Sequence, residues 1–112
     1  RVNNGVHYIL ARSGDTYESI ADEMVYLVRD LFHFNDVEKG YQPKPGEKVY
    51  IEIKKEEADV SFHTVVAGET MHGISQLYGI RLKSLYARNR MKAGTEAEPG
   101  QRLWLQGYAP LY

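Results

Sequence analysis

The sequence contains no cysteine. This absence excludes a disulfide scaffold, a thiolate metal site and a cysteine nucleophile. The chain also lacks any apolar run close to the roughly 18 residues that a membrane-spanning helix needs, so we expect no membrane insertion. Neither sign of charge dominates, because fourteen Lys and Arg stand against fifteen Asp and Glu. A net charge of −1 argues against a dedicated nucleic-acid binder.

The chain also begins without a Met, at Arg1. We therefore expect a piece of a longer protein, in which any targeting signal would lie upstream. Of the 112 residues, 43% are hydrophobic and 26% are charged. This composition is typical of folded globular proteins and argues against a disordered tail. The nine tyrosines suit either a packed core or a sugar-facing surface, because Tyr joins an apolar ring to a hydroxyl.

The chain repeats itself once, and the two copies align without gaps. The matching pairs are Gly14-Asp15-Thr16 with Gly68-Glu69-Thr70, Ile20 with Ile74, Leu31 with Leu85, Asn35 with Asn89, and Pro45-Gly46 with Pro99-Gly100. Identities fall on turn residues and similarities on apolar ones, as two copies of one fold require. We predict two modules, 6–53 and 61–106, joined by a charged, solvated linker at 54–60. Residues 1–53 carry six basic and nine acidic side chains, whereas residues 61–112 carry six and three.

Each copy has the same predicted order of elements. A short strand comes first, at 7–11 and again at 62–66. Thr16 or Asp15, and likewise Thr70, can cap the helix that follows. Gly79 ends that helix in the second copy, but Val25 stands at the matching position of the first copy. A second helix, a polar loop, Pro-Gly and a final strand complete a β-α-α-β unit, so the predicted class is α+β with two such units.

This ordered set of motifs resembles the LysM family of carbohydrate-binding modules. The second copy follows the family pattern almost throughout, in His63–Thr70, Ile74, Tyr78-Gly79-Ile80, Leu85, Asn89 and Pro99-Gly100. The first copy departs from it at Ala11 and at Met24-Val25-Tyr26. The tandem is also similar to the C-terminal regions of bacterial cell-wall glucosaminidases. The resemblance implies that each module is a two-stranded antiparallel sheet packed on two helices and that the protein belongs to the cell envelope.

The resemblance further implies binding to glycans that contain N-acetylglucosamine, such as peptidoglycan or chitin, without a cofactor. In the family the sugar lies between the loop after the first strand and the loop before the last. By position, the first module contributes Gly14, Asp15, Thr16, Tyr17, Asp36, Val37 and Tyr41. The second contributes Gly68, Glu69, Thr70, Met71, Arg90 and Met91. We expect a monomer that binds neither nucleic acid nor metal and has no catalytic residues.

Several of these residues allow a second interpretation. Tyr17 and Met71 fit a groove or a core equally well, because their helical spacing also allows packing. Asn35 and Asn89 can contact ligand or bond to nearby backbone. The acidic residues Asp15 and Glu69 suggest a glycosidase pair, but each belongs to its own repeat and fits a helix start better. The four histidines show no metal-ligand spacing.

Two other functions stay open at this point. Arg81, Lys83, Arg88, Arg90 and Lys92 form a basic stretch in the second copy, which is a feature of proteins that bind anionic surfaces. A protein-interaction module that kept the fold without sugar contacts is the remaining alternative.

Overall fold

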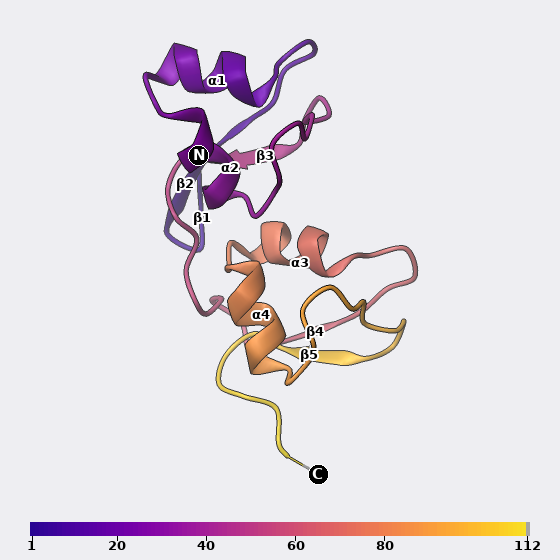
Figure 1. Cartoon of the computed structure of the whole chain (residues 1–112). Helices are drawn as coiled ribbons and strands as arrows, with labels where there is room; N and C mark the ends of the chain where they lie inside the picture. The colour runs from indigo at the N-terminus through magenta and orange to yellow at the C-terminus, as the bar shows by residue number, and fades with distance from the viewer. Residues whose placement is uncertain (112) are drawn as a thin grey trace. The chain divides into compact units, whose positions relative to one another are not determined.

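The computed structural model describes residues 1–111, which form two compact units, residues 1–54 and the chain from residue 55 onward. The first unit contains β1 (Val2–Asn3), β2 (Val6–Leu10), α1 (Tyr17–Met24), α2 (Val28–Phe34) and β3 (Lys48–Tyr50). The second contains β4 (Phe62–Thr64), α3 (Met71–Tyr78), α4 (Leu82–Arg88) and β5 (Arg102–Trp104). Figure 1 shows a pair of short helices with a small sheet in each unit. The module boundaries at 6–53 and 61–106 stay predictions.

Both units pair an early strand with the last strand in antiparallel fashion. Tyr8 lies opposite Tyr50 in the first unit, and Phe62 lies opposite Trp104 in the second. These two pairs occupy matching positions of the repeat, and the helices of the two units begin and end at matching positions as well. The predicted α+β fold with its strand, helix, helix, strand order is therefore confirmed.

The first sheet has a third strand that the sequence did not predict. The strand β1 pairs with β2, so the order in this sheet is β1-β2-β3. Asn4 and Gly5 connect them with positive φ angles of 55° and 74°, as the two-residue turns of tight hairpins require. Since β1 is only two residues long, it shows no alternation of apolar and polar residues from which a strand could be predicted.

Threonine begins the first helix of each unit. The Thr16 side chain accepts a hydrogen bond from the Ser19 N–H, and the Ser19 hydroxyl oxygen accepts one from the Thr16 N–H. Thr70 accepts in the same way from the Gly73 N–H at 3.0 Å. The helix cap is thus the threonine and not the preceding acid, and it fixes where the chain turns from loop to helix.

The same helices end in the left-handed conformation. Val25 has a φ of 60° and Gly79 a φ of 68°. Glycine adopts this conformation freely, whereas an L side chain costs about 1–2 kcal/mol. Val25 is 90% exposed, so its side chain makes little packing contact that could offset this strain.

The core of each unit is shared between its helices and its strands. The first core is formed by Ala11, Tyr17, Ile20, Ala21, Leu31, Phe32 and Val49. The second is formed by Ala58, Val65, Met71, Ile74, Ile80, Leu85, Tyr86, Leu103 and Leu105. Those that lie in the helices, such as Ile20 and Ile74, recur at the helical spacing that predicts a buried face.

A buried asparagine in the first unit and a half-buried one in the second tie the second helix to the last strand. The side-chain N–H of Asn35 donates to the carbonyls of Leu31 and Tyr50, each at 2.9 Å, and its oxygen accepts from the Tyr50 N–H at 2.7 Å. Asn89 makes the same three bonds at the matching position of the second unit. Both side chains therefore serve the backbone, the second of the two roles that the sequence left open.

The segment 54–60 is less solvated than its charge predicts. Lys54 is only 1% exposed and Ala58 only 6%. Lys55 forms a parallel β-bridge with Ile80, at the corner between α3 and α4. The expectation of a solvated linker is wrong at Lys54 and Ala58, because a charged composition does not reveal which side chains become buried.

Candidate functional site

The first wall of each predicted groove is a tight turn held by an acid. An oxygen of Asp15 accepts the N–H of Arg12 at 2.7 Å, and one of Glu69 accepts the N–H of Val66 at 2.7 Å. These backbone hydrogen bonds are the main reason that the pKa of each acid lies below its usual value. The carboxylates thus bind loop amides three residues upstream, which differs from the expected contact with the helix start.

The turn glycines lie at the surface of these loops. Gly14 and Gly68 have φ angles of 86° and 90° and are exposed. Nothing lies within 4 Å of a side chain built on either one. Both therefore present backbone to solvent, in a conformation that glycine adopts without strain.

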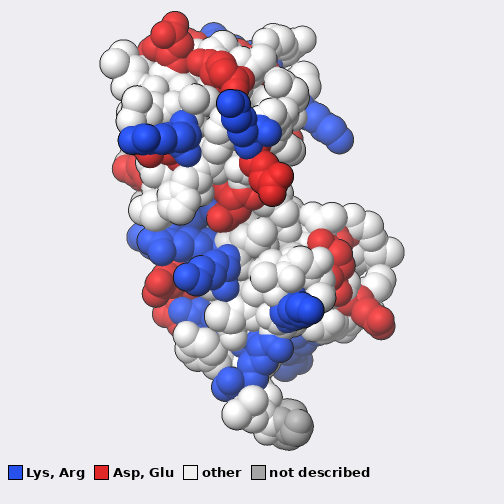
Figure 2. Space-filling view, in the orientation of Figure 1, with Lys and Arg blue, Asp and Glu red and all other residues white. Residues whose placement is uncertain are grey.

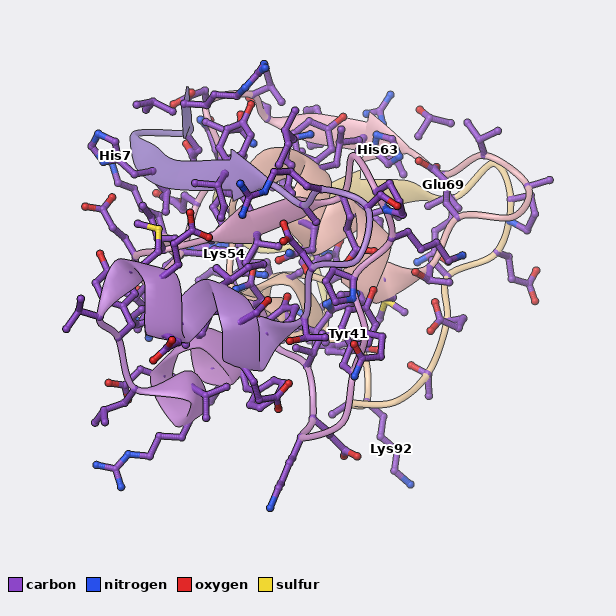
Figure 3. The ribbon with its side chains drawn as sticks, turned by 90° about the horizontal axis from the view of Figure 1, so that it is seen from above. His7, Tyr41, Lys54, His63, Glu69 and Lys92 are labelled. Carbon is purple, nitrogen blue, oxygen red and sulfur yellow. The ribbon has the colours of Figure 1, made fainter. Side chains whose placement is uncertain are left out.

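In the second unit a histidine extends the turn into a network. His63 Nε2 lies 2.9 Å from Glu69 Oε1, and His63 Nδ1 lies 2.7 Å from the Tyr78 hydroxyl. Figure 3 shows His63 and Glu69 next to each other. Burial, followed by the charge of Glu69, raises the pKa of Tyr78. The first unit has Ile9 in place of His63, so this network belongs to the second unit alone.

Two predicted site residues have their side chains in the core. Tyr17 and Met71 are each 0% exposed. The Tyr17 ring stacks on Phe32 with 5.1 Å between ring centroids and meets Tyr41 edge-on at 5.9 Å. Within residues 1–111 the Tyr17 hydroxyl has no hydrogen-bond partner, and burial raises its pKa. Of the two interpretations left open by the sequence, the structure thus gives these side chains core packing.

The second wall of the first unit runs from Asp36 to Glu47. Asp36 Oδ2 lies 2.9 Å from the buried Lys54 ammonium, and Val37 packs against the core. The Tyr41 hydroxyl donates to a Glu47 oxygen at 2.7 Å. Burial, followed by this bond, raises the pKa of Tyr41 to about 12. Tyr41 is half-buried. Part of its ring therefore faces solvent and can form part of the groove wall.

The matching wall of the second unit holds different contacts. Arg90 donates through Nε to the Ala109 carbonyl at 2.6 Å, and Met91 packs against the core. Lys92 extends from this loop in Figure 3. Glu96 accepts the Met71 N–H at 2.7 Å, so the loop before β5 reaches the first residue of α3. The two predicted walls of this groove are therefore joined by a hydrogen bond.

The first unit lacks that joining bond. Gln42 stands at the position that matches Glu96, and its side chain is exposed. The Tyr17 N–H, which matches the Met71 N–H, has no partner among residues 1–111. The helix-start amide of the first unit is thus unpaired but enclosed, because Tyr17 is 0% exposed, whereas the matching amide of the second unit is occupied by a carboxylate.

Sequence reasoning missed Lys54, His63, Glu96 and Tyr108 as residues that shape the loops.

Among residues 1–111, no three His, Asp or Glu side chains gather in a way that could hold a metal ion. In the same part of the chain, the helices are too short and too polar to cross a bilayer. The groove residues offer backbone amides, carbonyls and aromatic or apolar surface, which is chemistry for binding.

Comparison with known protein families gives a match to part of the chain. Residues 63–106 match the LysM domain, so the second unit contains a LysM domain. No curated protein matches the chain.

Among solved structures, the chain is similar to the Bacillus cereus spore cortex-lytic enzyme SleL, with 21% identity and a TM-score of 0.40 over 93% of this chain. It is also similar to SleL of Bacillus megaterium QM B1551, with 21% identity and a TM-score of 0.38 over 95% of this chain. The chain spans 23% of the length of each of these proteins.

Proposed function

We propose that the chain is a non-catalytic module that attaches a parent protein to glycans containing N-acetylglucosamine, with a LysM module in each unit. Peptidoglycan is the favoured ligand and chitin the second, which would place the protein in the cell envelope as a monomer. The observation that carries the proposal is the LysM match at 63–106. The first unit supports its extension to the whole chain, because its helices and paired strands recur in the second at a fixed spacing.

The groove chemistry fits an N-acetyl group. Such a group offers a carbonyl that needs an N–H donor, an N–H that needs an acceptor, and a methyl that needs apolar cover. The half-buried Tyr41 ring supplies apolar cover, and the exposed backbone at Gly14 and Gly68 supplies polar groups. Because exposed Gly14 and Gly68 leave room above the backbone, a sugar can approach the loops closely.

The acidic residues of the grooves do not favour hydrolysis. A glycosidase needs two carboxyl groups flanking one bond, whereas Asp15 and Glu69 lie in different units. Each is also engaged in its own turn. Two weak grooves on one chain instead favour avidity for a polymer, because the second binding event becomes intramolecular.

Retention on insoluble peptidoglycan and on chitin tests the proposal. The full chain should sediment with at least one of the two, and added salt should change the bound fraction little, because the sugar is neutral. Release of reducing ends should stay at the level of a blank. Failure to sediment with either polymer would contradict the proposal and favour a protein-interaction module. Binding that disappears in salt would favour an anionic-surface binder.

A further inference from the structure

A second recessed site lies in the second unit, outside the turn at 66–71 that forms the first wall of the predicted groove. It is a hollow of about 190 Å³. One side is formed by α4 and the other by the segments before β4 and after β5. Its wall includes Glu56, Arg81, Lys83, Ser84, Arg88 and Tyr108. Lys and Arg side chains gather over the part of this unit that carries α4 (Figure 2).

A buried arginine lies in the wall of the hollow. Arg88 is 7% exposed. Its Nε donates to the Glu56 carbonyl at 2.6 Å and its Nη1 to the Gly107 carbonyl at 2.9 Å. The carboxylate of Glu57, 3.2 Å from Nη1, is half exposed to solvent. The positive charge is therefore fixed in place but only partly neutralised within the fold.

The chain after β5 is held against this arginine. The Arg88 guanidinium lies 5.0 Å from the centre of the Tyr108 ring, and the Arg90 guanidinium lies 5.9 Å from it. Arg90 also holds the Ala109 carbonyl. Because three contacts fix this segment, the hollow exists before a ligand arrives, and binding orders little additional chain.

The rim adds further positive charge and a hydroxyl. Arg81, Lys83 and Ser84 reach the hollow from the start of α4, and Lys83 is exposed. With Arg88, three cations line the hollow, where Glu56 is the acid in the lining and Glu57 pairs with Arg88 beside it. Guanidinium, ammonium and hydroxyl groups are the donors with which proteins bind phosphate and carboxylate oxygens.

The first unit shows that the fold does not require this charge. At the positions that match Arg81, Ser84 and Arg88, it carries Leu27, Asp30 and Phe34. Of the three cations, only Lys83 has a basic counterpart, Arg29. The same scaffold therefore folds without a basic hollow.

We propose that this hollow binds an oxyanion, a phosphate or a carboxylate group, in the same unit as the second glycan groove. The ammonium of Lys83 and the guanidinium of Arg81 contact its oxygens, Ser84 donates a hydrogen bond, and Arg88 supplies the fixed charge. None of these four side chains is a predicted sugar contact, so either site can fail without the other, although Arg90 belongs to the groove and also holds the segment after β5.

Titration of the ¹⁵N-labelled full chain with inorganic phosphate, and separately with acetate, tests the proposal. Sodium chloride keeps the ionic strength constant throughout. Saturable shifts of the Ser84, Gly107 and Tyr108 amides are expected with at least one anion. Saturation by phosphate alone, by acetate alone or by both would support the site and identify its preferred group. Strictly linear shifts with both anions would overturn it.

Variants separate the site from general charge effects. Lys83→Gln and Arg81→Gln should each weaken the saturable binding about fivefold, the size of one exposed ion pair. Arg29→Gln removes the matching charge of the first unit and should leave binding unchanged. Because Lys83 and Arg29 are both exposed, these two variants should fold alike, which an unchanged amide spectrum elsewhere will verify. Equal weakening by Arg29→Gln would contradict a local site.

Discussion

The ammonium of Lys54 lies 2.9 Å from the carboxylate of Asp36, with Lys54 almost fully buried. Burial lowers the pKa of Lys54, and the nearby carboxylate offsets part of that effect. The matching residues of the second unit, Tyr108 and Arg90, are in contact as well, through a ring and a guanidinium. Positions 36 and 90 were predicted to bind sugar, but in each unit the residue there contacts the segment that follows the last strand.

The first prediction follows from this pair. Asp36→Asn removes the carboxylate and leaves a buried ammonium without this ionic partner, so the free energy of unfolding should fall. We expect about 2 kcal/mol, less than for a fully buried pair because Asp36 is partly exposed. Urea unfolding of the full chain measures the loss. The matched control, Asp22→Asn on the exposed face of α1, should change stability by less than about 0.5 kcal/mol.

The second prediction concerns the left-handed residue at the end of α1. Val25→Gly should stabilise the first unit by about 1 kcal/mol, because it removes the strain of a β-branched residue with positive φ. The reverse change at the matching position, Gly79→Val, should destabilise the second unit. Thermal unfolding measures both. An unchanged or lower melting temperature for Val25→Gly would contradict the strain assigned to this corner.

The third prediction concerns Glu96, whose carboxylate holds the Met71 N–H. Glu96→Ala frees that amide for a ligand carbonyl, so a short oligomer of N-acetylglucosamine should bind the second unit more tightly. Gln42→Ala is the matched control in the first unit and should change little. Calorimetry gives the affinities, and the Met71 amide shift reports the freed donor. Weaker binding by Glu96→Ala would mean that the carboxylate itself contacts the sugar.

The fourth prediction is a loss of stability in alkali. The pKa of Tyr41 is about 12 in the folded chain, above its ordinary value of 10. Above pH 10 the unfolded chain therefore loses this proton first, and the stabilisation disappears as the pH rises through 12. Tyr41→Phe should make the free energy of unfolding fall less steeply above pH 10. If the free energy of unfolding falls equally steeply with pH in both proteins, the raised pKa of Tyr41 is refuted.

The sequence predicted what depends on neighbours along the chain. Thr70 caps its helix and Gly79 ends it, because each of these roles is set by residues within a few positions. In the first unit the cap was left open between Thr16 and Asp15, and Val25 was noted only as a departure from the glycine pattern. Because the repeat has a fixed spacing, the element order predicted for one copy also applied to the other. Asn35 and Asn89 kept two interpretations until the partners on the last strand were seen.

Contacts between distant segments could not be predicted in this way. Glu96 reaches Met71 across 25 residues, and Arg88 reaches Glu56 across 32. In the sequence these charged residues look like ordinary solvated side chains. Tyr17 was ambiguous for a related reason, because helical spacing shows which residues share a face but not what covers that face.

The most direct test of glycan binding is a titration of the ¹⁵N-labelled full chain with an oligomer of N-acetylglucosamine. We expect saturable shifts of amides in both loops of each groove, 12–17 and 36–47 in the first unit and 66–71 and 90–97 in the second. Gly14 and Gly68 should be among the most affected because their backbone is exposed. Unchanged amides in all four loops at the highest sugar concentration would contradict glycan binding by this chain.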